Sequence, residues 1–206
     1  MSAPGTVPTV VWDIGGVLLR WEPRVLLSEV LLPRHPGADV DVLRRAIFGS
    51  DAWHAFDSGR IGPEELAVRA AAAAGLEVED LDLLLEAIYP HLVDLTPTWE
   101  LVRRVRAAGH RVVYLSNMPH LITDRVGPRM TSLFEEGLFS CDAGEAKPSP
   151  AIFPLAERAL ALDPTRLLFF DDGVANVETA RAAGWRAVLF TGAAEAEKVL
   201  VADGWL

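Results

Sequence analysis

The sequence predicts an α/β protein: a doubly wound, Rossmann-like parallel sheet of five strands with an inserted α-helical cap. Three observations predict it. Short apolar runs without alternation recur along the chain, as is typical of strands buried on both faces of a parallel sheet. Helical patterns separate these runs, which indicates crossover connections. A long stretch, roughly residues 20–95, carries helical patterns but no convincing strand.

The expected strands share two properties: each is short and apolar, and most end at polar residues or glycine. In chain order they are Thr9–Trp12, Arg111–Leu115, Leu138–Ser140, Leu167–Phe170 and Arg186–Phe190. Parallel sheets bind ligands outside the carboxyl ends of their strands. We therefore expect the polar residues that follow the strands to converge at one edge.

The expected helices are bounded by ordinary start and stop signals, such as a preceding proline or a following glycine. Those of the core are Trp99–Ala108, Ala151–Leu162 and Val174–Ala183. Those of the insertion are Val25–Leu32, Asp41–Phe48, Glu64–Ala74 and Leu81–Leu92. We expect residues 1–19 and 96–206 to form the core and residues 20–95 to form a cap over its ligand-binding edge.

Composition excludes several classes of function. The net charge of −10 argues against nucleic acid as a partner, and it requires local positive charge, for instance a metal, at any phosphate site. With Cys141 alone no intrachain disulfide forms, which fits a reducing compartment. Residues 1–8 lack the features of a signal peptide, and no apolar run is long enough to span a membrane. We expect a cytoplasmic protein without membrane partners; the sequence does not indicate its oligomeric state.

Polar residues follow the predicted strands in four loops and form one chemical inventory of three carboxylates, a hydroxyl, an amide and an ammonium group. Carboxylates suit Mg²⁺, which keeps waters and substrate phosphate oxygens among its ligands. A lysine and a hydroxyl suit the remaining phosphate oxygens. The residues are Asp13, Ser116, Asn117, Lys147, Asp171 and Asp172.

These loops match four motifs in order. They are Val-Trp-Asp-Ile-Gly-Gly-Val-Leu at residues 11–18, Leu-Ser-Asn at 115–117, Glu-Ala-Lys-Pro at 145–148, and Phe-Phe-Asp-Asp at 169–172 with Asn176 shortly after. Each motif alone is weak, but all four in this order and spacing are specific. The chain resembles the haloacid dehalogenase superfamily over nearly its whole length, in the branch with a helical cap between the first two motifs. Its Asp-x-Gly variant is similar to the bacterial α-glucose-1-phosphate phosphatase group.

The resemblance implies a Mg²⁺-dependent phosphatase in which Asp13 attacks phosphorus and forms an aspartyl-phosphate. It implies metal binding by Asp13, the Gly15 carbonyl and Asp172, with Asp171 and Asn176 at metal-bound waters or supporting the ligands. It places Ser116, Asn117 and Lys147 at the phosphate, with Ser116 and Lys147 also serving catalysis. The implied substrate is a small phosphorylated metabolite such as a sugar phosphate.

Gly15 departs from the family pattern, because most phosphatases of the family carry there an aspartate that protonates the leaving oxygen. A positioned general acid contributes about 10²–10⁴-fold. Either the leaving group needs no acid, or a cap residue supplies the proton, or the protein is not a catalyst. His54 and His120 are candidates for the proton and for substrate binding, although such histidines more often serve packing or lie on the surface. The aromatic residues Trp21, Trp53 and Phe56 are read as cap core rather than as a substrate platform.

Two other functions stay open. A dehalogenase of the same fold uses the aspartate against carbon without a metal, and would have little use for the Asp171–Asp172 pair. A catalytically weakened phosphate-binding or regulatory module is supported by Gly15 alone. Dinucleotide-binding and P-loop proteins are excluded, because neither glycine motif occurs.

Overall fold

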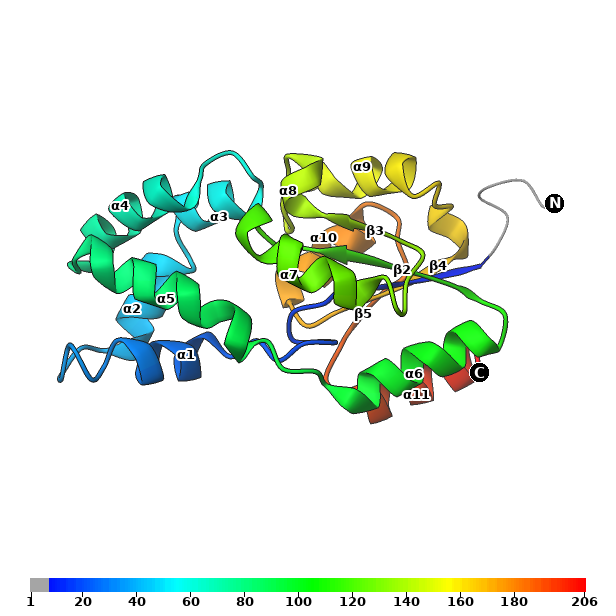
Figure 1. The fold of residues 1–206 in the computed structure, drawn as a ribbon. Coiled ribbons are helices and arrows are strands. Elements are labelled where there is room, and N and C mark those ends of the chain that lie inside the picture. The colour runs from blue at the N-terminus through cyan, green and yellow to red at the C-terminus, as the bar shows by residue number, and fades with distance from the viewer. Residues whose placement is uncertain (1–7) are drawn as a thin grey trace.

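A computed structural model describes residues 8–206, and a five-stranded parallel sheet forms the centre of the fold (Figure 1). The strands are β1 (Thr9–Trp12), β2 (Arg111–Ser116), β3 (Glu136–Phe139), β4 (Leu167–Asp171) and β5 (Ala187–Leu189). Their order is β3-β2-β1-β4-β5, and every neighbouring pair is parallel. The predicted fold class is confirmed. The expectation that the N-terminus is not a signal peptide concerns residues that lie mostly outside the described range, since residues 1–7 are not described. The first seven residues of the expected core also lie outside that range.

The third strand differs from its prediction: it begins at Glu136 rather than Leu138 and ends at Phe139. Gly137 pairs with Tyr114 of β2, and a Cβ at Gly137 would overlap the Tyr114 ring. That ring also lies 4.7 Å from the ring of Phe139. A glycine weakens the strand signal in the sequence, but here an aromatic ring from the neighbouring strand covers it.

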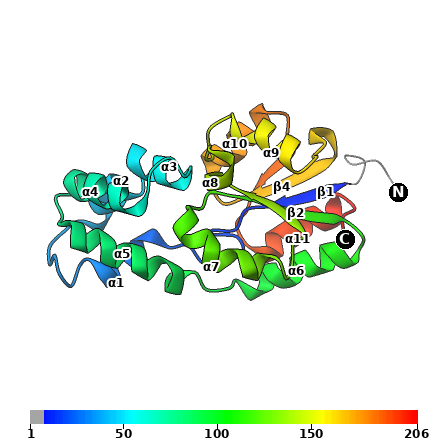
Figure 2. The same cartoon turned by 45° about the horizontal axis from the view of Figure 1, so that its top comes forward.

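Helices cover both faces of the sheet because successive side chains of a buried strand point to opposite faces. Val10 and Trp12 of β1 belong to one core cluster and Val11 to another. Figures 1 and 2 show α6 and α11 side by side on one face, with α9 on the other. The helices that follow the first five in the chain are α6 (Thr96–Ala107), α7 (His120–Met130), α8 (Ser140–Ala143), α9 (Ile152–Ala159), the short helix η1 (Pro164–Arg166), α10 (Val174–Ala182) and α11 (Ala193–Ala202).

The chain between β1 and α6 forms a group of five helices that lies beside the sheet (Figure 1). They are α1 (Pro23–Val30), α2 (Val40–Ile47), α3 (Asp51–Asp57), α4 (Pro63–Ala74) and α5 (Val78–His91). Four of them match the helices expected there, and α3 is an additional helix that the sequence analysis did not predict. None of the helices in the described part of the chain has the length and apolar character needed to cross a bilayer.

Two linking segments join this helical group to the sheet and run side by side. The backbone N–H of Arg20 donates to the carbonyl of Val93, and that of Leu95 donates to the carbonyl of Leu18, both at 2.8 Å. The Leu18 carbonyl also accepts the indole N–H of Trp99 at 2.9 Å. These bonds lie close to the expected boundaries at residues 20 and 95, and the division into core and cap stays a prediction.

Candidate active site

The polar residues expected to form the site lie where the central strands end. Asp13 directly follows β1, and its backbone N–H donates to the carbonyl of Phe170 on β4 at 2.9 Å. Ser116 is the last residue of β2, and Asp171 is the last residue of β4. Because β1 lies between β2 and β4, the sheet places Asp13 between these two residues.

The ammonium group of Lys147 is buried among these strand ends. Its Nζ lies 3.0 Å from Oδ1 of Asp13, 2.5 Å from Oδ2 of Asp171 and 2.9 Å from the carbonyl oxygen of Leu115. Three acceptors match the three donors of an ammonium group. Burial alone would lower the pKa of Lys147, but the two carboxylates outweigh it and hold the pKa above its usual value. Lys147 is therefore charged and held in one orientation.

Asn117 holds the loop that carries Lys147. Its side-chain Oδ1 accepts the backbone N–H of Lys147 at 2.8 Å, and its Nδ2 donates to the Lys147 carbonyl at 2.7 Å. The expectation placed Asn117 at the phosphate. The residue does line the cavity described below, but both ends of its amide are used to position the lysine.

Both carboxylate oxygens of Asp171 already have hydrogen-bond donors. Oδ2 accepts from Lys147, and Oδ1 accepts from the backbone N–H of Gly173 and from Nδ2 of Asn176, each at 2.8 Å. The expectation for Asp171 and Asn176 was a place at the metal site, at metal-bound waters or supporting the ligands. In the structure Asp171 orients Lys147 and Asn176 orients Asp171, and their place at the metal site stays a prediction.

Three carboxylates come close enough to share a cation. Asp13, Asp171 and Asp172 each offer an oxygen atom, and these atoms lie within 4.8 Å of one another. Burial raises the pKa of Asp13 to about 7, with repulsion from Asp171 and Asp172 adding to the rise and Lys147 opposing it. Three carboxylates around one ammonium leave an excess of negative charge. Such a site fits a hard cation with oxygen ligands, such as Mg²⁺.

Asp172 lies at the exposed rim of the site, next to Gly16. The partial burial of its carboxyl and the nearby Asp171 raise the pKa of Asp172. Gly16 has φ +73°, and a Cβ there would overlap the Asp172 carboxylate. Glycine at this position therefore leaves the room that Asp172 occupies. Gly15 and Asp172 both line the cavity with Asp13.

A cavity of about 260 Å³ opens between the strand ends and the helical group. Its floor is polar and its cap wall is mostly apolar. The floor residues are Asp13, Gly15, Ser116, Asn117, Lys147, Asp172 and Asn176, and the remaining lining residues are Trp21, Phe48, Trp53, Asp57, Ile88, Leu92, Met118, Pro119 and Ile122. Trp53 belongs both to the apolar core and to this wall, so packing and lining the cavity are not alternatives for it.

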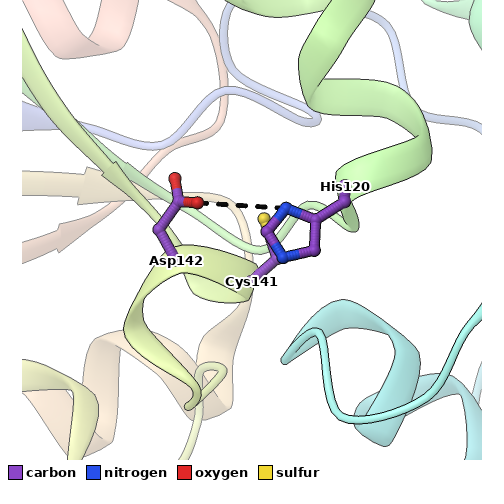
Figure 3. Close-up of side chains that lie close together, drawn as sticks. All are labelled: His120, Cys141 and Asp142. Carbon is purple, nitrogen blue, oxygen red and sulfur yellow. Dashed lines mark ion pairs between the residues drawn. The ribbon is translucent and has the colours of Figure 1, made fainter.

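Neither His54 nor His120 is among the residues that line this cavity. His120 instead faces Asp142, with Nδ1 3.9 Å from Oδ1, and Cys141 lies beside the pair (Figure 3). Burial, with Asp142 adding to it, raises the pKa of Cys141 to about 11, so the thiol is protonated at neutral pH. The roles expected of His54 and His120 stay predictions.

Asp57 is a site residue that the sequence analysis did not single out. It is the last residue of α3 and lines the cavity from the cap wall. Burial raises the pKa of Asp57 to about 7, although a hydrogen bond from the Trp53 side chain and the charge of Lys147 lower it. A usable signal was present, because Asp57 follows Trp53 by four residues and so shares its helix face. This spacing is informative only if the helix α3 is predicted first.

Comparison with known proteins places these motifs in one family. The family model described as haloacid dehalogenase-like hydrolase matches residues 7–184. Acyl-CoA dehydrogenase family member 10 of Mus musculus is 25% identical over 184 residues, and Protein CbbY of Rhodobacter capsulatus is 30% identical over 125 residues. The matched regions are 85% of this chain and 17% of the mouse protein, and 58% of this chain and 55% of Protein CbbY. The chain thus spans only part of the length of these two relatives.

A third relative matches along most of both chains. The sesquiterpene phosphatase astK of Aspergillus oryzae is 23% identical over 188 residues, which cover 87% of each protein. Among solved structures, a haloacid dehalogenase family enzyme of Bacteroides thetaiotaomicron has a TM-score of 0.71 at 21% identity, covering 89% of this chain and 93% of that one. The same enzyme in complex with magnesium and inorganic phosphate has a TM-score of 0.68 at 20% identity, with the same coverage.

Proposed function

The chain belongs to the haloacid dehalogenase-like hydrolases, and we propose that within this family it is a Mg²⁺-dependent phosphatase of a small phosphorylated metabolite. One observation carries the proposal: the Lys147 ammonium bridges Asp13 and Asp171 at the strand ends, with Asp172 close enough to share a cation with Asp13. This set combines a nucleophile with positive charge for a transferring phosphoryl group.

Asp13 is held as an in-line nucleophile requires. Its Oδ1 accepts the backbone N–H of Ile14 at 2.7 Å and lies 3.0 Å from Nζ of Lys147, so the carboxylate cannot turn freely. In the proposed reaction an Asp13 oxygen forms a bond to phosphorus while the bond from phosphorus to the alcohol oxygen breaks, and that oxygen takes up a proton. Water then attacks phosphorus and releases inorganic phosphate and the Asp13 carboxylate. Ser116, buried at the end of β2, lines the same floor and would donate its hydroxyl to a phosphoryl oxygen.

The proposed metal ligands are Asp13, the carbonyl of Gly15 and Asp172. Bound there, Mg²⁺ would neutralise charge on the phosphoryl oxygens. Asp171 and Asn176 support the site through Lys147, because Asp171 accepts hydrogen bonds from Lys147, Gly173 and Asn176. The magnesium and phosphate bound by the Bacteroides thetaiotaomicron enzyme are consistent with this proposal.

The cap wall bears on the substrate class. Sugars offer several hydroxyl groups and need several polar partners, because a buried polar group without one is costly. Within residues 8–206, Asp57 is the one ionisable residue on a wall otherwise formed by side chains such as Trp21, Phe48, Trp53 and Ile88. We propose that the alcohol carries an apolar portion against this wall; the name of the relative, sesquiterpene phosphatase, agrees with such a substrate. Sugar phosphates stay in the set to be tested.

The two alternatives make different demands on the same residues. A metal-independent dehalogenase would leave the charge of Asp172 uncompensated beside Asp13 and Asp171. A module without turnover would leave unused a nucleophile held by two hydrogen bonds. The phosphatase proposal uses all of these groups.

The test is a screen of purified protein with sugar phosphates, nucleotides, aryl phosphates, alkyl phosphates and 2-haloacids, each with Mg²⁺ and with a chelator. We expect release of inorganic phosphate with Mg²⁺, loss with the chelator, recovery on adding Mg²⁺, and no release by Asp13→Asn. Chloride release that ignores the chelator would establish the dehalogenase. Phosphate or Mg²⁺ binding without turnover on any substrate would establish the binding module.

A further inference from the structure

We infer from the geometry that Asp57 is the general acid that protonates the leaving oxygen. It would replace the acidic side chain that Gly15 lacks. The inference rests on the proposed phosphatase function and deepens it. It assigns a catalytic residue to the cap wall and thereby makes the cap part of the reacting site.

Position 15 has room for a side-chain atom but supplies no acid. Gly15 does not have a positive φ, and a Cβ added there would meet Trp21 atoms at 3.7 and 3.9 Å, which is ordinary van der Waals contact. The backbone therefore does not require glycine, and a Cβ would fit. Trp21 borders this space, and no proton donor comes from position 15 itself.

Few groups at the cavity could supply the proton. Four ionisable residues line the cavity in the described chain: Asp13, Asp57, Lys147 and Asp172. Asp13 is the nucleophile. Lys147 gives its three donors to three acceptors, and Asp172 is the proposed metal ligand. Asp57 alone has no other assignment.

Asp57 lies on the side of the cavity opposite the nucleophile Asp13. In phosphoryl transfer the attacking and leaving oxygens lie roughly in line, on opposite sides of phosphorus. Asp13 attacks from the sheet edge, so the leaving oxygen points toward the cap wall. Asp57 lies on that wall, at the end of α3.

The backbone at Asp57 is fixed relative to the sheet, although Asp57 belongs to the helical group. The hydroxyl of Ser140 donates to the Asp57 carbonyl at 2.5 Å and accepts the backbone N–H of Met118 at 2.9 Å. At Gly59 the backbone has φ +69° and comes so close to α8 that a Cβ would lie 2.9 Å from the Cys141 carbonyl oxygen. This docking fixes the Asp57 backbone relative to the sheet, and the Trp53 side chain hydrogen-bonds the Asp57 carboxyl. An efficient general acid needs such positioning before substrate binds.

The protonation behaviour agrees with the role. With a pKa of about 7, raised mainly by burial, Asp57 is present in acid and base forms at neutral pH, so it can donate to the leaving oxygen and then accept from water. Lys147, Asp13 and Asp172 share the cavity with it and face it from the floor. Beyond Gly59 lie His120 of α7 and Asp142 of α8, and His54 lies on α3 itself.

The experiment compares an alkyl phosphate with an aryl phosphate in wild type and Asp57→Asn, with Mg²⁺ present. An acid matters most for a basic leaving group, so we expect kcat/KM for hexyl phosphate to fall about 10²-fold or more. For 4-nitrophenyl phosphate kcat/KM should fall far less. Breakdown of the aspartyl-phosphate should become slow without the base, which produces a stoichiometric burst of 4-nitrophenol.

In wild type kcat/KM for hexyl phosphate should fall as pH rises above about 7, and this dependence should vanish in Asp57→Asn.

Two further variants control the test. Asp51→Asn makes the same change at the exposed start of α3, away from the cavity, and should behave as wild type. Gly15→Asp combined with Asp57→Asn should restore activity on hexyl phosphate, because an acid returns to the site. Circular dichroism and Tm of each variant establish folding.

Equal losses on both substrates without a burst, or no loss on either, would overturn the role of Asp57 while leaving the phosphatase intact. If the wild type releases phosphate from neither ester, the proposed function itself has failed, and the burst and rescue measurements are not reached.

Discussion

Lys147 Nζ lies 2.5 Å from Oδ2 of Asp171, and both side chains are fully excluded from solvent. The second oxygen of Asp171 accepts two further hydrogen bonds, from Gly173 and Asn176. Asp171 and Asp172 are adjacent in sequence, yet only Asp172 lies at the exposed rim. The pair therefore divides two tasks, one carboxylate compensating a buried lysine and the other available to a cation.

This division predicts different effects on stability for the same Asp→Asn substitution at the two positions. Removing one partner of a buried ion pair costs about 3–5 kcal/mol, so Asp171→Asn should lower the free energy of unfolding by on the order of 3 kcal/mol in urea titrations. Asp172→Asn removes repulsion at an exposed position and should leave that free energy nearly unchanged. Mg²⁺ should raise the Tm of wild type through binding to the folded state, and should no longer do so in Asp172→Asn. A stable Asp171→Asn variant that fails to respond to Mg²⁺ would reverse the assignment.

A second prediction concerns the room that Gly16 leaves for Asp172. A methyl group at Gly16 would overlap the Asp172 carboxylate and would also strain a residue with φ +73°. We expect Gly16→Ala to displace Asp172 and to abolish both the Tm response to Mg²⁺ and phosphatase activity. Gly109→Ala is the matched control, since φ is +92° there but nothing lies within 4 Å of the added Cβ. It should cost about 1–2 kcal/mol of stability, from backbone strain alone, and keep its activity. Equal Mg²⁺ responses in the two variants would contradict the steric explanation.

The sequence predicted the sheet well because its strands are buried on both faces and therefore read as unbroken apolar runs, as Leu167–Phe170 does. The polar residues at the strand ends were found for the same reason. Partnerships among them were not predictable, since nothing in the sequence says that Asn117 holds Lys147 or that Asn176 holds Asp171. Each of these side chains could bond to several partners, and the packing of loops that are distant in sequence determines which one it contacts.

The cap side of the site was harder to predict. The helix α3 has seven residues, which is too short for a helical period to stand out. Its neighbourhood offers His54 and Asp57 as possible acids, and titration near neutral pH favoured the histidine. Burial brings the pKa of Asp57 to about 7 as well, and that burial depends on how α3 docks against Ser140, which the sequence does not show.

A third prediction concerns the stability of the helical group. Asp80 is buried and accepts hydrogen bonds from Arg34 Nε at 2.6 Å and His35 Nε2 at 2.8 Å. Burial alone would raise the pKa of Asp80, but these bonds outweigh it and hold the pKa below its usual value. A depressed pKa contributes stability that is present above the unfolded-state pKa, near 4, and is lost as pH falls through the folded-state value.

Asp80→Asn should therefore lower the free energy of unfolding at pH 7 by about 1–3 kcal/mol, the cost of losing charged hydrogen bonds. The difference from wild type should shrink as the pH is lowered below about 4, in denaturant titrations from pH 3 to 7. Glu79→Gln, an exposed neighbour on α5, is the control and should change little at any pH. A deficit that does not vary with pH would mean that shape rather than charge is responsible.

The last prediction tests the apolar wall through Phe48, which lines the cavity with its ring 5.4 Å from that of Trp21 and 4.5 Å from that of Trp53. Removing the ring deletes apolar surface that only an apolar substrate uses. Phe48→Ala should lower kcat/KM about 10-fold for hexyl phosphate, because a few methylene contacts are worth about 1–3 kcal/mol. Methyl phosphate offers the Phe48 ring only one methyl group and should lose little. Val42→Ala on α2, exposed and outside the lining, should change neither substrate. A sugar phosphate distinguishes the two substrate classes: if it is the better substrate and loses more than hexyl phosphate in Phe48→Ala, the rings stack on a sugar and the apolar alcohol is the wrong class.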